Sequence, residues 1–353
     1  MASVDNVDDE MLSYSLLPFF ILGVVRIALA CFGIAANIVS IRVLTHKSIW
    51  SATSILLISL VVYDTVFLFT GAVVIIAGLP EYEEDHLFVT VTVFYPFRYI
   101  AQMGSVYSTV AVTVERFVVV VTPLRARSIW TTNNARRVAI GVFVFSLGFN
   151  IPRCVVFHQL SSADWVENGT LTQTDASQAF LYTRVYEVYL TMAMFYILPY
   201  TIIIVLNINL IVHLRISARV TKTISPRHTA STSPTDKEDG LTIVVLGITT
   251  CFFVCCVIPL TYHILLLADL DLFSNPHKVY LFAVSDTMLC VNSATDFIFY
   301  CLLGRRFRNV FYKLFCPCLC RRRSSPVNQN RLTLLQMKGI PCSNTRYTIS
   351  ELR

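Results

Sequence analysis

The sequence predicts an all-α membrane protein, a bundle of seven transmembrane helices, from its composition, its long apolar runs and the placement of its charges. Of 353 residues, 55% are hydrophobic and only 14% are charged, whereas a soluble domain carries about 25% charged residues. The mean hydropathy is +0.63. The net charge of +6 comes from basic residues that stand between apolar runs, which argues against nucleic-acid binding.

Seven apolar runs are each long enough to span a bilayer, because a transmembrane helix needs about 20 mainly apolar residues. The runs lie at 17–44, 53–79, 95–121, 137–157, 187–213, 241–267 and 278–302. Residues 1–10 contain four acids and no Lys or Arg, the reverse of a signal peptide. We therefore expect the first span to act as an uncleaved anchor.

The loops differ in charge on the two sides of the membrane. Arg and Lys gather in one set, for example at Arg136, Arg137, Arg305 and Arg306, while the other set is rich in acids. The positive-inside rule then predicts a multi-pass plasma-membrane protein with an extracellular N-terminus and a cytoplasmic C-terminus. Asn168, in the glycosylation sequon Asn168-Gly169-Thr170, falls on the outer side, as glycosylation requires.

Polar side chains interrupt the spans, where ionisable groups are costly and usually functional. The carboxylates Asp64 and Asp296 lie in the second and seventh spans, and the uncharged members are Asn37, Ser105, Asn292 and Ser293. A single Asn or Ser is most simply explained by an interhelical hydrogen bond. Two carboxylates with hydroxyl and amide groups suit a small cation, such as sodium at Asp64, or a shared proton.

A second charged group marks the inner end of the third span. Glu115-Arg116-Phe117 is followed by Pro123-Leu124. An arginine at a membrane boundary can simply extend to the interface, but its acidic neighbour makes a plain anchor the weaker interpretation. Asp239, before the sixth span, is a candidate ionic partner for Arg116.

The order of these motifs resembles the rhodopsin-like (class A) G-protein-coupled receptors. Glu115-Arg116-Phe117 is similar to the Asp/Glu-Arg-Tyr signature, and Asn37 and Asp64 to the polar residues of helices one and two. Phe253-x-x-Cys256-x-x-Pro259 is similar to the sixth-helix motif, and Pro199 to the fifth-helix proline. The segment Asp296–Tyr300 occupies the place of Asn-Pro-x-x-Tyr, and the segment Phe307–Phe311 resembles the amphipathic eighth helix.

The resemblance implies roles for several residues. Glu115, Arg116, Phe117, Leu124, Asp239 and Tyr300 would form the G-protein-coupling switch, and Phe253, Cys256 and Pro259 the sixth-helix switch. It also implies an extracellular segment 1–16, a seven-helix domain 17–303, an eighth helix 304–315 and a disordered cytoplasmic tail 316–353.

A narrower resemblance is to invertebrate FMRFamide-type neuropeptide receptors. It is carried by Tyr95-Pro96, Ile100-Ala101-Gln102, Ser105-Val106-Tyr107, Pro123-Leu124-x-Ala126-Arg127 and Phe149-Asn150-Ile151-Pro152-Arg153. An extracellular peptide, a heterotrimeric G protein, arrestin and kinases are the partners implied.

The sequence departs from the family pattern at three places. Val257 stands where the sixth helix usually has Trp, and Phe297 where the seventh usually has Pro. Residues 80–110 contain no Cys, so the usual disulfide to the second outer loop is absent, and we expect Cys154 to be a free thiol.

The outer half of the bundle is the expected ligand site, with Arg98, Gln102, Glu187, Tyr262 and Asp286 as candidate ligand-binding residues. Arg98 would repel an amine. A retinal Schiff base needs a Lys midway along the seventh span, where Cys290 lies instead and Lys278 is only at the outer edge. The guanidinium of an Arg-Phe-amide peptide would seek a carboxylate, for which Asp286 is the best candidate. The alternative is that Asp286 pairs with Arg98. The outer aromatic residues either stack on the ligand or form an interfacial belt.

The tail carries Cys316, Cys318 and Cys320 before a run of three arginines. Juxtamembrane thiols beside basic residues favour palmitoylation and attraction to anionic lipid, whereas a metal site would need further ligands.

Two alternatives to a neuropeptide receptor stay open. One is a chemosensory or small-molecule receptor of the same fold. The other is an ion-coupled transporter or channel that uses Asp64 and Asp296, although the sequence lacks repeated halves and paired broken helices. No nucleophile, metal or phosphate-binding motif, and no cofactor requirement, points to an enzyme.

Overall fold

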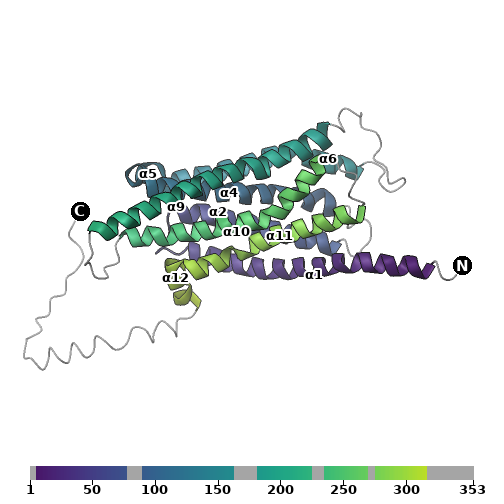
Figure 1. Cartoon of the computed structure of the whole chain (residues 1–353), viewed down its shortest axis with the longest axis horizontal. Coiled ribbons are helices and arrows are strands. Elements are labelled where there is room, and N and C mark those ends of the chain that lie inside the picture. The colour runs from purple at the N-terminus through teal and green to yellow at the C-terminus, as the bar shows by residue number, and fades with distance from the viewer. Residues whose placement is uncertain (1–4, 78–89, 163–180, 225–233, 269–274, 316–353) are drawn as a thin grey trace, which may run out of the picture. The chain divides into compact units, whose positions relative to one another are not determined.

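The computed structural model describes residues 5–77, 90–162, 181–224, 234–268 and 275–315, and within these ranges every regular element is a helix. The chain divides into two compact units, Met1–Arg308 and Asn309–Arg353. The helices are labelled in Figure 1. Their bounds are α1 Asp5–Leu44, α2 Ala52–Ala77, η1 Thr90–Phe94, α4 Tyr95–Val121, α5 Pro123–Ile129, α6 Thr132–Ser162, η2 Leu181–Leu190, η3 Met192–Ile197, α9 Leu198–Ile224, α10 Pro234–Ala268, α11 Asn275–Leu303 and α12 Arg305–Phe315.

Six spans are long and apolar enough to cross a membrane, and a seventh passes the same test when α11 and α12 are taken together. The six are Ile21–Leu44, Ala52–Ala77, Thr92–Val121, Thr132–Val156, Arg184–Ile216 and Gly240–Ala268. The chain turns by 96° between Leu303 and Arg305. The seven-helix bundle predicted from hydropathy is confirmed.

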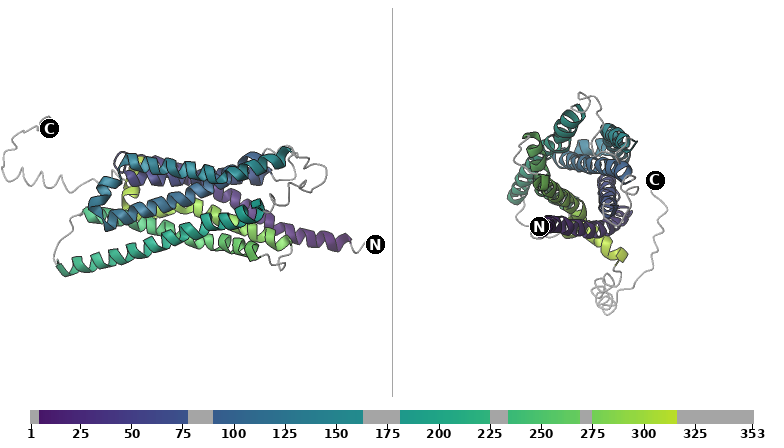
Figure 2. Two further views of the ribbon diagram at one scale, coloured as in Figure 1. Left: turned by 90° about the horizontal axis from the view of Figure 1, so that it is seen from above. Right: turned by 90° about the vertical axis from the view of Figure 1, so that its right-hand side faces the viewer.

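The helices of the first unit run side by side, as the two views of Figure 2 show. Helix α4 packs against α2, α6 and α9, and α11 packs against α1 and α10. Gly33 allows α1 to approach its neighbours closely, since a Cβ there would lie 2.5 Å from Leu68 Cδ1 and 2.9 Å from the Ala294 Cβ. Small residues let membrane helices pack in this way.

The fifth span differs from the regular α-helix that hydropathy suggests. Its outer part consists of the π-helices η2 and η3, which join at Thr191 before α9 begins. The Thr191 hydroxyl donates to the Tyr186 carbonyl oxygen, five residues earlier, at 3.0 Å. π-Helical segments are rare and often lie at functional sites. Here the wider turns decide which side chains of η2 face the bundle interior.

Several sequence predictions concern segments outside the described ranges. These are the sequon at Asn168 and the tail with Cys316, Cys318 and Cys320. Helix α1 begins at Asp5, well before the span predicted from residue 17. Backbone hydrogen bonds can continue a helix beyond the apolar part of its sequence. Hydropathy therefore locates the membrane span but not the end of the helix.

Candidate functional site

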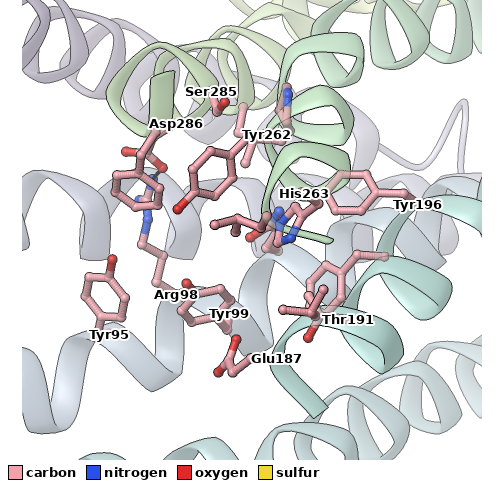
Figure 3. Close-up of a pocket in the computed structure, with 17 residues that line it drawn as sticks. Tyr95, Arg98, Tyr99, Glu187, Thr191, Tyr196, Tyr262, His263, Ser285 and Asp286 are labelled. Carbon is pink, nitrogen blue, oxygen red and sulfur yellow. Dashed lines mark hydrogen bonds and ion pairs between the residues drawn. The ribbon is translucent and has the colours of Figure 1, made fainter. Parts of the chain in front are cut away.

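A cavity of about 250 Å³ lies between α4, the η2–η3 segment, α10 and α11. Figure 3 shows the polar side chains around it. All five candidate ligand-binding residues line this cavity. The complete lining is Tyr95, Arg98, Tyr99, Gln102, Glu187, Val188, Thr191, Phe195, Tyr196, Pro259, Tyr262, His263, Leu266, Phe282, Ser285, Asp286 and Leu289.

Asp286 on α11 is held by two arginines. One carboxylate oxygen, Oδ2, accepts a hydrogen bond from Arg26 Nη1 on α1 at 2.8 Å. The other, Oδ1, accepts from Arg98 Nη2 on α4. The side chains are 12% exposed for Asp286 and 8% for each arginine. Of the two arrangements that the sequence left open for Asp286, the structure shows the internal pair with Arg98, and it adds Arg26, which sequence reasoning missed.

A second ion pair joins α6 to the fifth span. Arg153 Nε and Nη2 donate to the two oxygens of Glu187, at 2.9 and 2.8 Å. The Arg153 side chain is fully buried, while that of Glu187 is 28% exposed. The Arg153 guanidinium carbon also lies 3.7 Å from the ring centroid of Tyr99, a favourable cation–π contact. The sequence analysis noted Arg153 only as part of the motif shared with FMRFamide-type receptors, so its pairing with Glu187 was missed.

Aromatic residues divide between the cavity and the outside of the bundle. Tyr95, Tyr99 and Tyr262 line the cavity, whereas Tyr189 and Tyr280 are 53% and 49% exposed. The first subset is placed to contact a ligand and the second faces outward, and both interpretations of the aromatic residues stay predictions.

A second polar group lies deeper in the bundle around Asp64, which is fully buried. Its Oδ1 accepts hydrogen bonds from the Ser105 and Ser293 hydroxyls, both at 2.8 Å, and the Asn37 amide donates to the Ser293 carbonyl oxygen at 3.3 Å. Asp296, on the same helix as Ser293, is also buried. Four helices thus place their polar residues at one point, as the sequence predicted.

Two atoms of this cluster lack a hydrogen-bond partner among the described residues: Asp64 Oδ2 and Asn37 Oδ1. Both are hard oxygen acceptors, which fit a small cation or a proton shared between the two carboxyl groups. Asn292 is only half-buried, and no hydrogen bond from its side chain joins it to the cluster in the described part of the chain.

At the inner end of α4, Arg116 forms an ion pair with its neighbour Glu115, with Nε to Oε2 at 2.5 Å. Thr53 on α2 completes the group. Its hydroxyl oxygen accepts from Arg116 Nη2 at 2.5 Å, and the hydroxyl donates to Glu115 Oε1 at 2.8 Å. All three residues are buried. Phe117 is half-buried beside them.

Asp239, the expected partner of Arg116, belongs to α10, but its side chain lies outside the described set. The described partners of Arg116 are Glu115 and Thr53. Leu124 on α5 is 84% exposed, so it presents an apolar surface. Tyr300 is 2% exposed and stacks on Phe307 with 5.3 Å between ring centroids.

The sixth-helix residues fall on the inward side of α10. Phe253 contacts Tyr200 with ring centroids 5.3 Å apart, Cys256 packs in the apolar cluster around Phe252, and Pro259 lines the outer cavity. Val257 is 58% exposed. Position 257 therefore does not face the core in this conformation, although the motif aligns it with the usual Trp.

Cys154 is a free thiol, as expected, and no three of the described His, Cys, Asp and Glu residues are grouped as a metal site.

Comparison with known proteins gives a consistent assignment. Residues 36–300 match the model of the 7 transmembrane receptor (rhodopsin family). The chain is 25% identical to the FMRFamide receptor of Drosophila melanogaster over 88% of its own length, but spans only 56% of that receptor. It is 26% identical to neuromedin-U receptor 2 of Mus musculus, covering 84% of this chain and 73% of the receptor.

A further relative, the probable G-protein coupled receptor frpr-1 of Caenorhabditis elegans, is 22% identical over 92% of this chain and 86% of that protein. The matched family region covers most of the chain and all of the site residues named above from Asn37 to Tyr300. The family consists of receptors, not enzymes, that have an extracellular ligand and an intracellular G protein. This chain belongs to the rhodopsin family of seven-transmembrane G-protein-coupled receptors and is related to the invertebrate FMRFamide receptors.

Proposed function

We propose that this receptor responds to an extracellular amidated peptide of the Arg-Phe-amide type and signals through a heterotrimeric G protein. The observation that carries the proposal is the composition of the outer cavity, which combines aromatic rings with a partly exposed carboxylate, Glu187. Aromatic rings stack on phenylalanine side chains, and a carboxylate binds a guanidinium through charge-assisted hydrogen bonds. Two relatives, an FMRFamide receptor and a neuromedin-U receptor, support the same class of ligand.

Glu187 is a better partner for the peptide guanidinium than Asp286. Each oxygen of Asp286 already accepts from an arginine, so a third cation would have to displace a buried one. Glu187 is paired with a single arginine, Arg153, and its side chain is 28% exposed against 12% for Asp286. The assignment of the guanidinium contact therefore moves from Asp286 to Glu187.

Activation would proceed as a shift between two packings of the bundle. In the conformation described here, Glu115 and Thr53 hold Arg116, and the Asp64 cluster ties α1, α2, α4 and α11 together. An agonist that prefers a different arrangement of α10 and α11 would release Arg116 toward the G protein. A small cation or a shared proton at Asp64 and Asp296 would favour the resting packing.

The membrane arrangement follows from the loop charges: a plasma-membrane receptor with an extracellular N-terminus, a glycan at Asn168 and a cytoplasmic tail. The exposed Leu124 on α5 would contact the G protein. Arrestin and kinases would act on the same face. Palmitoylation of Cys316, Cys318 and Cys320 would bind the tail to membrane lipid.

The test is G-protein activation in cells that express the full chain, with Phe-Met-Arg-Phe-amide and its neutral analogue Phe-Met-Leu-Phe-amide as probes. A hydrogen bond to a charged group contributes about 1.5–3 kcal/mol. We therefore expect Glu187→Gln to reduce the potency of the Arg peptide at least about tenfold and to leave the Leu analogue unchanged.

Glu187→Asp, which keeps the charge, serves as the matched variant, and surface expression is measured for each. Equal losses for the two probes would rule out the contact with Glu187. A receptor that responds to no amidated peptide but to a small chemosensory compound would overturn the peptide assignment.

A further inference from the structure

The guanidinium of Arg98 occupies a built site at the junction of α2, α4 and α11. Its Nη1 donates to the Phe67 carbonyl oxygen at 2.9 Å, and its central carbon lies 3.9 Å from the Phe67 ring centroid. Gly71 makes room for it, because a Cβ at Gly71 would lie 2.9 Å from Arg98 Cζ and closer still to Nη1. Close approach of this kind is a specific use of glycine. The side chain is therefore fixed in place and does not sample the cavity freely.

The charges at this junction do not balance. Asp286 is the only carboxylate among the described residues that contacts Arg26 or Arg98. The three side chains, which we call the arginine node (Arg26, Arg98 and Asp286), thus carry a net charge of +1. A buried charge without a counter-charge is costly. The other carboxylate of the cavity, Glu187, is already paired with Arg153.

The surplus charge is accessible from the cavity. Arg98 and Asp286 both line it, and Figure 3 shows Arg98 extending from α4 toward Asp286, with Glu187 farther along the group of side chains. The Arg98 guanidinium has five N–H donors, of which those described go to Phe67, Asp286 and, at 3.9 Å, the sulfur of Cys290. Donor capacity toward a ligand therefore remains.

We propose that the arginine node binds a carboxylate of the extracellular ligand, supplied by an acidic side chain of the peptide. The inference rests on the proposed peptide-receptor function and adds a second contact to it: an Asp or Glu side chain that raises affinity beyond the Arg contact with Glu187 and that a response does not require. A carboxylate at Arg98 neutralises the node and forms charge-assisted hydrogen bonds that are shorter and stronger than neutral ones. The cavity then favours a peptide with charges of both signs.

The node also explains why two arginines are present. One arginine would neutralise Asp286 and leave a neutral pair with no affinity for an anion. Arg26 provides the surplus without lining the cavity itself, so it acts as a positioning and charge-setting residue. Replacing Arg26 by Gln keeps a donor for Asp286 Oδ2 and removes the surplus charge.

The experiment measures binding by thermal unfolding of the purified full chain in detergent, since a ligand that binds only the folded state raises the unfolding temperature. The probes are N-acetylaspartate N-methylamide and its neutral twin N-acetylasparagine N-methylamide. For the unmodified receptor we expect the aspartate probe to bind at least tenfold more tightly than the asparagine probe. For Arg26→Gln we expect the ratio to fall to about one.

The matched control is Arg42→Gln, which removes an exposed arginine from the last turn of the same helix and should keep the tenfold preference. Equal binding of both probes to the unmodified receptor would overturn the proposal, as would an unchanged preference in Arg26→Gln. The assay uses neither G protein nor agonist. If the proposed function is wrong and the arginine node is right, the receptor will prefer the aspartate probe but activate no G protein with any amidated peptide.

Discussion

Replacing Asp286 by Asn should destabilise the receptor strongly, because it leaves two buried cations without a counter-charge. The substitution keeps the size of the side chain and one acceptor oxygen. Both guanidinium groups are 8% exposed, so solvent can offset little of the lost interaction. The effect should exceed that of Glu187→Gln, where the carboxylate lost is 28% exposed.

The magnitude follows from the two contacts. At about 4 Å and an effective dielectric constant of about 20, each charge pair contributes about 4 kcal/mol. Removing Asp286 loses two such contacts but also removes the cost of burying the carboxylate itself. Breaking a buried ion pair by deleting one partner typically costs about 3–5 kcal/mol, and we expect Asp286→Asn to fall in that range.

The assay is thermal unfolding of the purified receptor without ligand, followed by the exposure of buried thiols such as that of Cys290. Asp286→Asn should lower the unfolding temperature by several degrees. Adding Arg26→Gln to Asp286→Asn removes one of the two unpaired cations and should recover part of the loss. An unfolding temperature equal to that of the unmodified receptor, or a double variant less stable than the single one, would refute the charge argument.

Three further variants test other parts of the account. Thr53→Val removes the hydroxyl that holds Arg116. The lost hydrogen bond contributes about 1.5 kcal/mol, so ligand-independent G-protein activation should rise about tenfold. An unchanged basal level would count against a restraining role for Thr53. Asp64→Asn should remove agonist-driven signalling while surface expression persists, whereas normal signalling would show that the buried cluster is only structural. Gly71→Val should displace the Arg98 guanidinium and reduce the preference for the aspartate probe to below threefold, an effect checked by the same thermal titration; a retained tenfold preference would show that the guanidinium does not need that position.

The sequence was sufficient for the spans and for the polar cluster around Asp64. Hydropathy locates the helices because every segment that spans the lipid must be apolar and must satisfy its backbone hydrogen bonds internally, as a helix does. Asp64, Ser105 and Ser293 could be grouped because each is a costly polar residue near the middle of its span. Their direct hydrogen bonds are the consequence of that shared depth.

The charge pairs of the outer half could not be assigned in the same way. Arg26 lies in an apolar run near the predicted outer end of α1, where an arginine usually extends to the interface, and nothing in its neighbourhood distinguishes it from such an anchor. Its partner is 260 residues away. Pairing of this kind depends on how α1 and α11 rotate about their axes, which the residue pattern of a fully apolar helix does not determine.

The fifth and sixth spans show a related difficulty. The π-helices η2 and η3 add residues to each turn, so a count of 3.6 residues per turn does not give the face on which a side chain of this segment lies. In α10 the motif aligns Val257 with the usual Trp, yet its side chain is 58% exposed. Positions inferred from a motif hold only where the helix keeps the geometry that the motif assumes.

The central claim, that this chain is a G-protein-coupled receptor for an amidated peptide, is tested most directly by G-protein activation in response to an amidated-peptide library, read as calcium and cyclic-AMP signals. The comparison is between the unmodified receptor and Arg116→Ala at equal surface expression. We predict a concentration-dependent response to at least one Arg-containing amidated peptide in the unmodified receptor and none in Arg116→Ala. No response to any amidated peptide, or equal responses in the two proteins, would contradict the account.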